Sequence, residues 1–479
     1  MKNKNLWLSL LIFTAVMFLL SWIIPATDYN ESGVLAVSQI NPVGIWDIGY
    51  FTTMLLPWFG QNAVFLIAMG AFYGIISNTN AFKSLVEKIA EPFKKKENLF
   101  LVVSSGLFIL VSSITGVTFP LLFFVPLVIG VILRLGFGKI TTLTATVFSI
   151  LVGSIGSLYV APLYASLSSA GVENAFIYGW YKLGLILASL VAIPAYLFLT
   201  SKIAKGKEKE NIAEEELLLT GEGKAKKVAL WPLVTTYIVI LVLFILGFTS
   251  WSTIFNFNGF VDFNTKLLEF KIGDFSIFGS ILGTSLVPFG TWNAAQGVWT
   301  AIPAVTIILI ATIILIFIYK IDWEEVYKGF VSGVNKLMPA IILVTVANIA
   351  FIIASQSGFI ITITHFLSNI TDSVNSFTYS LASFIGASVV NENYVASHIT
   401  STMIGVLGQE QMAQMPILVF IQQMMSGVAM LVAPTSAVLI FGLTYLDVSY
   451  TNWLKKMWIP IVVIAAVVVT IISVIIFIA

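Results

Sequence analysis

The feature that most constrains this chain is a series of apolar stretches about 20 residues long. Residues 6–24 and 458–478 are two of them, and each is long enough to cross a hydrocarbon layer of about 30 Å as a helix. With 58% hydrophobic and only 10% charged residues, the chain has too little polar surface to cover a soluble globule. The sequence therefore predicts an all-α polytopic membrane protein.

The first apolar stretch follows MKNKN, and no small-residue cleavage site of the A-x-A kind comes after it. We therefore expect a retained first helix and not a signal peptide. The chain has no cysteine, which excludes disulfides, thiolate chemistry and cysteine-ligated metals.

The basic residues predict the topology, because loops rich in lysine stay in the cytoplasm. With the N-terminus inside, all but three of the 24 basic residues fall on the cytoplasmic side, and the exceptions are Lys182, Lys266 and Lys271. This distribution requires two apolar stretches, 99–135 and 376–410, to enter the membrane and return as re-entrant hairpins. About nine full crossings are expected, at 6–24, 60–78, 140–164, 177–200, 229–249, 297–319, 338–357, 411–441 and 458–478. Residues 44–60 and 276–294 are apolar but interrupted, and we expect them at the outer interface.

An internal repeat connects the two halves of the chain. YVAPLYASL begins at residue 159 and LVAPTSAVL at residue 431, and the same offset places Gly116-Val117 opposite Ser388-Val389. GAFYGIISNTNAF (70–82) resembles IAFIIASQSGFI (349–360) at nearly that offset. Because the lysines place the mouths of the two hairpins on opposite sides, we expect inverted repeats; the alternative is a chance recurrence of Val-Ala-Pro. The expected domains are a first repeat (1–200), a charged cytoplasmic linker (201–228), a connecting span (229–249) and a second repeat (250–479).

Inverted repeats with interrupted helices bind substrate and coupling ions near the middle of the membrane. Pro162 and Pro434 interrupt equivalent helices, since proline lacks a backbone donor, and the freed carbonyls can bind an ion or a substrate. Hydroxyl and glycine residues cluster after these prolines and at both hairpin tips. The candidate residues are Ser112, Ser113, Thr115, Gly116, Thr118, Pro162, Ser166, Ser388, Pro434, Thr435 and Ser436. Such hydroxyls can instead bond their own helix or pack between helices.

The stretch GASVVNENYVASHIT places an acid and a histidine between apolar runs, at the predicted tip of the second hairpin. An ionised side chain near the bilayer centre costs about 2.5–3.5 kcal/mol, so we expect Glu392 to bind substrate or a coupling proton. The alternatives are a shallow hairpin that lets Glu392 reach outer water, or a protonated Glu392 bonded to Asn391 or Asn393. His398 is either a proton carrier or a donor in helix packing. These four residues complete the candidate site.

Five motifs follow one another along nearly the whole chain: LLSWIIPATDY, IAMGAFYGIISNTNAF, SSITGVTF, PLVIGVILRLGFGKITTLTATVFSILVGSIGSLYVAPL and VAPTSAVLIFGLTYLDVSYTNWLKKMWIP. In this order they resemble the YfcC-like and four-carbon-dicarboxylate carrier group of bacterial secondary transporters, which is related to the p-aminobenzoyl-glutamate carriers. The resemblance implies an elevator-type carrier built from inverted repeats with two hairpins, and some members are arginine/ornithine antiporters.

The chain departs from the family pattern in three places. GVTF is followed by PLLFF without an acid, the second tip reads GASVVNENY, and Met425-Ser426-Gly427 stands where a Gly-Asp-Gly-like run is usual. The family therefore does not by itself settle the substrate.

Charge gives a prediction for the substrate. A dicarboxylate would need cations, helix N-termini or bound sodium in the site. We expect no Lys or Arg near either tip, because Arg134 and Lys139 fall at the cytoplasmic end of the first hairpin and Lys182 lies near the outer face. The expected substrate is therefore a cationic or zwitterionic amino acid, with arginine/ornithine exchange as the most specific form. An ion-coupled four-carbon-dicarboxylate carrier is the alternative.

Other classes of protein fit less well. An ion channel is the main alternative, but paired broken spans favour a carrier. No nucleophile elbow, paired acid or phosphate-binding loop accompanies the serines, so we expect no enzymatic activity. We expect no cofactor. The expected coupling ion is sodium or a proton, and a sodium ion could bind at the hairpin tips. The expected partners are a small-molecule substrate and the lipid bilayer, with no nucleic acid. The sequence leaves open whether the chain forms a homodimer. The expected location is the bacterial inner membrane.

Overall fold

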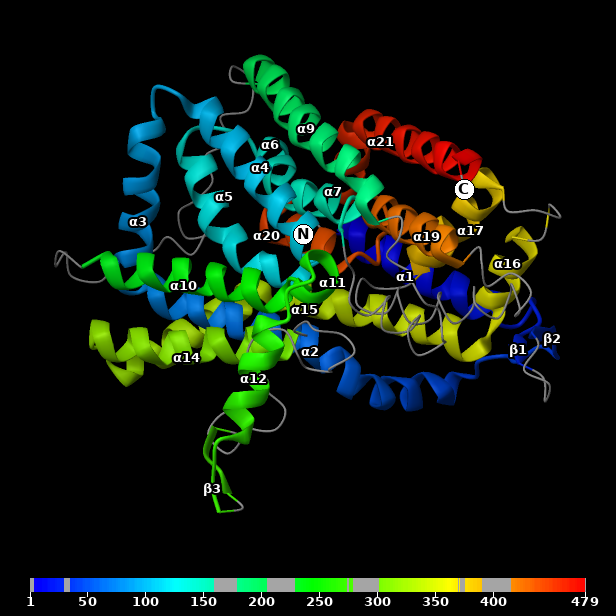
Figure 1. Ribbon diagram of the computed structural model, residues 1–479, viewed down its shortest axis with the longest axis horizontal. Helices are drawn as coiled ribbons and strands as arrows, with labels where there is room; N and C mark the ends of the chain where they lie inside the picture. Colours follow the sequence, from blue (N-terminus) through cyan, green and yellow to red (C-terminus); the bar gives the residue numbers. More distant parts are fainter. Residues whose placement is uncertain are drawn as a thin grey trace.

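The computed structural model describes residues 4–29, 35–158, 179–204, 229–273, 275–278, 301–368, 370, 375–389 and 415–478. Helices make up nearly all of this part of the chain (Figure 1). Two short antiparallel pairs of strands join them, β1 (Thr27–Tyr29) with β2 (Leu35–Val37) and β3 (Lys271–Ile272) with β4 (Phe275–Ser276). The predicted all-α fold class is confirmed for the described residues.

The helices follow the apolar stretches of the sequence. The first half contains α1 (Lys4–Leu20), α2 (Ile45–Ser77), α3 (Ala81–Ala90), η1 (Glu91–Phe93), α4 (Glu97–Thr115), η2 (Phe119–Phe124), α5 (Val125–Arg134), α6 (Lys139–Leu143), the π turn η3 (Thr144–Phe148), α7 (Ser149–Ile155), η4 (Gly179–Tyr181) and α9 (Lys182–Ala204). The second contains α10 (Trp231–Phe248), α11 (Trp251–Phe255), α12 (Gly259–Glu269), α14 (Ala301–Tyr319), α15 (Trp323–Ser357), α16 (Phe359–Ser368), α17 (Ser376–Val389), α19 (Met415–Met430), α20 (Ala437–Tyr445) and α21 (Tyr450–Ile478).

Five helices of the described part are long and apolar enough to cross a membrane alone, or six when the bent pair α2–α3 counts as one span. The five are α4, α9, α10, α15 and α21. These helices are fewer than the nine predicted spans, but they come from the described residues alone, so the number of spans stays a prediction. Because α4 itself has the length of a span, re-entry of the stretch 99–135 also stays a prediction.

Two helices extend beyond the segments that the sequence predicts. Residues 44–60 do not form a separate segment, because α2 runs without interruption from Ile45 to Ser77. Gly44 is its N-cap, and the Gly44 N–H donates to Asp47 Oδ2 at 2.7 Å. Likewise α15 begins at Trp323, well before the predicted span 338–357, and continues through Pro339. Membrane helices tolerate such proline and glycine positions because neighbouring groups satisfy the freed backbone atoms.

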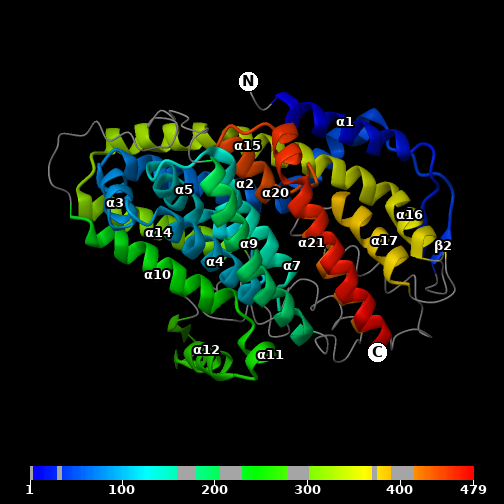
Figure 2. The same ribbon diagram turned by 90° about the horizontal axis from the view of Figure 1, so that it is seen from above.

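The long helices α2 and α15 pack together and run beside each other through the molecule (Figure 2). Each contributes two glycines spaced four residues apart, Gly70 with Gly74 and Gly329 with Gly333. A Cβ atom at Gly70 would lie 2.8 Å from the Gly333 carbonyl oxygen, and one at Gly329 would lie 2.7 Å from that of Gly74. Small residues at this spacing allow the close approach of helix backbones that stabilises membrane proteins. This pair joins the two halves of the chain.

Four shorter helices form a second packed group in the order α4, α7, α19 and α17. Glycines again allow the contacts: a Cβ at Gly153 of α7 would lie 2.6 Å from the Ile109 carbonyl of α4, and one at Gly427 of α19 would lie 2.6 Å from Ile155 of α7. The first arms of the two predicted hairpins, α4 and α17, therefore lie on opposite sides of the pair α7–α19.

Candidate functional site

The hydroxyls predicted at the first hairpin tip lie at the C-terminal end of α4 and are buried. Ser112 Oγ donates to the carbonyl of Ile150 at 2.9 Å, and Ser113 Oγ donates to that of Gly153 at 3.0 Å. Both carbonyls belong to α7 (Ser149–Ile155), and that of Gly153 is among its last four, which need partners outside the helix. The two serines therefore connect the tip of the first hairpin to the end of the broken helix.

The remaining residues of the first tip shape the chain turn. Thr115 Oγ1 donates to the Val111 carbonyl of its own helix at 2.6 Å. Gly116 ends α4 with a φ of +67°, a conformation that favours glycine. Thr118 lies at the N-terminal end of η2. These residues end the helix and have a structural role that requires no ligand.

The second tip shows a comparable connection. Ser388 Oγ donates to the Phe384 carbonyl of its own helix at 2.8 Å, while its backbone carbonyl accepts a 2.7 Å hydrogen bond from Thr435 Oγ1. Thr435 follows Pro434 in the break between α19 and α20, and Ser436 caps α20 by accepting from the Leu439 N–H at 3.4 Å. The structure therefore brings together Ser388 and Thr435, two residues of the predicted site. Pro162, Ser166, Asn391, Glu392, Asn393 and His398 lie outside the described residues.

Lys182, at the start of α9, was missing from the predicted site. Its side chain is fully buried, and it is the only charged residue buried in the described part of the chain. The ammonium group donates to the carbonyl of Ser157 at 3.2 Å and to Oε1 of Gln423, and it lies 5.5 Å from the centre of the Phe420 ring. None of the ion pairs between described residues includes Lys182.

Lys182 also lies beside the first hairpin tip. The residue after Ser157, Leu158, donates its N–H to the Ser113 carbonyl at 2.8 Å, so the segment that contacts Lys182 also contacts the end of α4. The expectation that no cation lies near either tip is therefore wrong for the first tip. The lysine count placed Lys182 near the outer face, although this lysine lies inside the predicted span 177–200, where a charged residue is usually functional.

Further buried hydroxyls lie on the helices near this site. Ser383 of α17 and Ser426 of α19 are buried, and their Oγ atoms have no hydrogen-bond partner among the described residues. Native proteins rarely leave such groups unpaired, so they offer hydrogen-bonding capacity to a ligand, an ion or water. Within the described ranges, no three His, Cys, Asp or Glu side chains lie close enough together to hold a metal ion.

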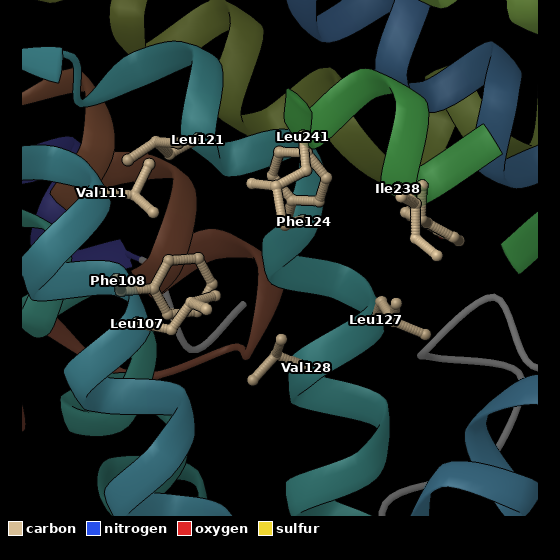
Figure 3. Close-up of a pocket in the computed structure, with 10 residues that line it drawn as sticks. Leu107, Phe108, Val111, Leu121, Phe124, Leu127, Val128, Ile238 and Leu241 are labelled. Carbon is tan, nitrogen blue, oxygen red and sulfur yellow. The ribbon is translucent and has the colours of Figure 1, made fainter. Parts of the chain in front are cut away.

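A cavity of about 200 Å³ lies elsewhere, between α4, the segment η2–α5 and α10 (Figure 3). Phe108, Leu127 and Ile238 project toward it from these three elements. Its lining is apolar except for Tyr237. A charged solute would lose its hydration there without gaining polar partners, so we place the candidate substrate site at Lys182 instead.

Comparison with known proteins adds two findings. The family model "C4-dicarboxylate anaerobic carrier" (DcuC) matches residues 5–479. Among solved structures, the chain is similar to the YdaH transporter of Alcanivorax borkumensis, with 13% sequence identity, a TM-score of 0.41, and coverage of 98% of this chain and 97% of that chain. A separate comparison with curated proteins found no match.

Proposed function

This chain belongs to the C4-dicarboxylate anaerobic carrier family, and from this premise we propose that it transports four-carbon dicarboxylates across the inner membrane of a bacterium. Its family and its apolar helices make it a secondary membrane transporter. The alternative substrate class from the sequence analysis thus takes the place of arginine/ornithine exchange.

The observation that carries this proposal is the buried ammonium group of Lys182. A buried charge is costly unless an opposite charge or several hydrogen bonds compensate it. In the described part of the chain, Lys182 has two oxygen partners and a ring, but no carboxylate. A substrate carboxylate would supply the missing charge. Arginine and ornithine also carry one carboxylate, but each brings an ammonium group on the neighbouring carbon and a cationic side chain, and like-charge repulsion with Lys182 disfavours both of these groups.

Two structural patterns support the proposed inverted repeats (1–200 and 250–479). In one half, α2 ends before Asn80, which has a φ of +58°, and α3 follows; in the other, α15 ends before Gly358, with a φ of +72°, and α16 follows. In each half, the first hairpin arm is then bonded to the segment after a broken helix. These patterns favour a carrier in which hairpins and broken helices move together. Elevator motion, sodium or proton coupling, the cytoplasmic N-terminus and a homodimer are part of this proposal.

Uptake by vesicles containing the purified protein tests the proposal. Labelled succinate should accumulate inside vesicles that carry a sodium or proton gradient, and unlabelled malate or fumarate should compete with it. Labelled arginine should not enter, whether the vesicles are empty or preloaded with ornithine. Faster arginine entry into ornithine-loaded vesicles, with no uptake of succinate, would overturn the proposal and support the hypothesis of arginine/ornithine exchange.

A further inference from the structure

Gln423 of α19 makes a two-sided contact at the candidate site. Its Oε1 accepts a hydrogen bond from Lys182, and its Nε2 donates to the Ser157 carbonyl at 2.5 Å and to Ser157 Oγ at 3.3 Å. The opposite orientation of the amide would place its N–H groups against the ammonium and its oxygen against the carbonyl. Chemistry therefore determines that the oxygen of Gln423 faces the cation.

The planar amide of glutamine has the shape of a carboxylate but no charge. We propose that the Gln423 side chain takes the place of the substrate carboxylate when no substrate is bound. In the empty carrier its Oε1 accepts the hydrogen bond from Lys182, and a carboxylate of the incoming substrate displaces it. This inference rests on the proposed function, because it specifies how the site recognises an anion.

The energetics favour such an exchange only for solutes that carry a carboxylate, and most for those without a cationic group beside it. The hydrogen bond between Lys182 and the amide oxygen already has an ionised donor. A carboxylate adds the attraction of opposite charges, which is strong at low dielectric, so it can replace the amide oxygen on Lys182. A solute without a carboxylate gains no such advantage and leaves Gln423 in place. Gln423 thereby excludes weakly binding solutes and keeps the buried lysine hydrogen-bonded when no substrate is present.

The exchange would also affect the contact between the two halves of the chain. Gln423 lies on α19 of the second half, and its partners Ser157 and Lys182 belong to the first. The same α19 leads into the break that holds Thr435, which is bonded to α17. Displacement of Gln423 would therefore release one polar connection of α19 to the first half when substrate arrives.

Two substitutions of Gln423 should have opposite effects on the KM for succinate uptake. Gln423→Glu places a permanent carboxylate against Lys182, which should compete with the substrate and raise KM at least tenfold, while the protein stays folded. Gln423→Leu leaves the lysine uncovered, so KM should fall several-fold. Gln423→Asn, one methylene shorter, should change KM in the same direction as Gln423→Leu and replaces it if the leucine variant does not fold.

A purely structural role for Gln423 predicts a different result, namely a loss of uptake in all three variants together with lower thermal stability. That outcome would overturn the inference, as would an unchanged KM in Gln423→Glu. Gln422→Glu adds the same charge one position along α19 and controls for a carboxylate on this helix; it should not reproduce the tenfold rise in KM.

Thermal stabilisation of the purified protein by succinate separates this inference from the proposed function. If wild-type vesicles take up no dicarboxylate, yet succinate stabilises the wild type and Gln423→Leu but not Gln423→Glu, the transport proposal fails and the anion site remains. If wild-type vesicles take up succinate but the glutamate and leucine variants change KM in the same direction, the exchange at Gln423 is refuted and the transport proposal remains.

Discussion

Thr435 donates its hydroxyl hydrogen to the backbone carbonyl of Ser388 over 2.7 Å. This bond joins the break after α19 to the end of α17, the first arm of the second predicted hairpin. In the first half, the Leu158 N–H and the Ser113 carbonyl make the corresponding connection over 2.8 Å. Each hairpin arm is therefore bonded to the broken helix that follows it, although one half uses a side chain and the other the backbone.

Replacing Thr435 by valine should weaken the second connection. The change keeps the size of the side chain but removes a partly buried hydrogen bond, and such a bond contributes about 0.5–1.5 kcal/mol. We expect a lower melting temperature and several-fold slower uptake. Thr444→Val is the matched control, because Thr444 Oγ1 donates to the Ile440 carbonyl of its own helix at 2.7 Å. Equal effects of the two substitutions would contradict a special role for Thr435.

The sequence predicts the apolar helices well, because a long apolar run with polar ends permits few placements. α10, α14 and α21 fall on the predicted spans 229–249, 297–319 and 458–478 to within a few residues at most ends. It predicts helix starts poorly where polar or proline residues lie inside a long helix, as at Pro339 in α15. Such a helix stays continuous because neighbouring groups satisfy its freed backbone atoms, and the local sequence pattern does not predict how those neighbours pack.

The candidate site was predictable only in part. The sequence assigned Ser388 and Thr435 to one candidate site, and a hydrogen bond joins them. Ser112 and Ser113, predicted at the first tip, donate to backbone carbonyls of α7. The contact between Lys182 and Gln423 joins residues from opposite halves of the chain, and no local spacing relates them. The lysine count treated Lys182 as a marker of the outer side, whereas its burial depends on tertiary packing.

The glycine contact between α2 and α15 should be intolerant of any side chain. In Gly333→Ala, the new methyl group would meet the carbonyl oxygen and carbon of Gly70, so the two helices must separate. Overpacking of this kind typically costs about 1–3 kcal/mol. Thermal unfolding in detergent should show the loss. Gly49→Ala, on the exposed part of α2 where nothing lies within 4 Å of the added atom, should unfold like the wild type; equal stability of both variants would contradict close packing here.

Topology can be tested cleanly because the chain has no cysteine. Single cysteines at positions 94 to 96 and at 205 should react with an impermeant reagent only from the cytoplasmic side, and one at position 372 only from outside. This pattern follows from the distribution of lysines. Labelling of positions 94 and 372 from the same side would remove the inverted repeat.

Glu392 lies outside the described residues, and its role stays a prediction. A carboxylate near a dicarboxylate would repel it, so we expect Glu392 to carry a coupling proton and to be neutral when substrate binds. Glu392→Gln should therefore abolish the stimulation of uptake by a proton gradient while the protein stays folded. The same assay on His398→Asn distinguishes a proton relay from a packing role. Unchanged proton stimulation in Glu392→Gln would show that the carboxylate has no part in coupling.

Lys182 provides the sharpest test, because structure and function predict opposite changes. Replacing a buried lysine that has no acidic partner in the described structure by methionine removes the cost of burying its charge, so Lys182→Met should be as stable as the wild type or more stable. The same change removes the cation proposed for the substrate carboxylate. A charged hydrogen bond contributes about 1.5–3 kcal/mol, and each 1.4 kcal/mol is tenfold in affinity, so succinate affinity should fall about ten- to a hundredfold. Lys266→Met, at an exposed position of α12, should leave uptake unchanged. If Lys182→Met instead loses stability and uptake together, the lysine holds the fold, for instance by pairing with an acid of the chain, and the anion site must be sought elsewhere.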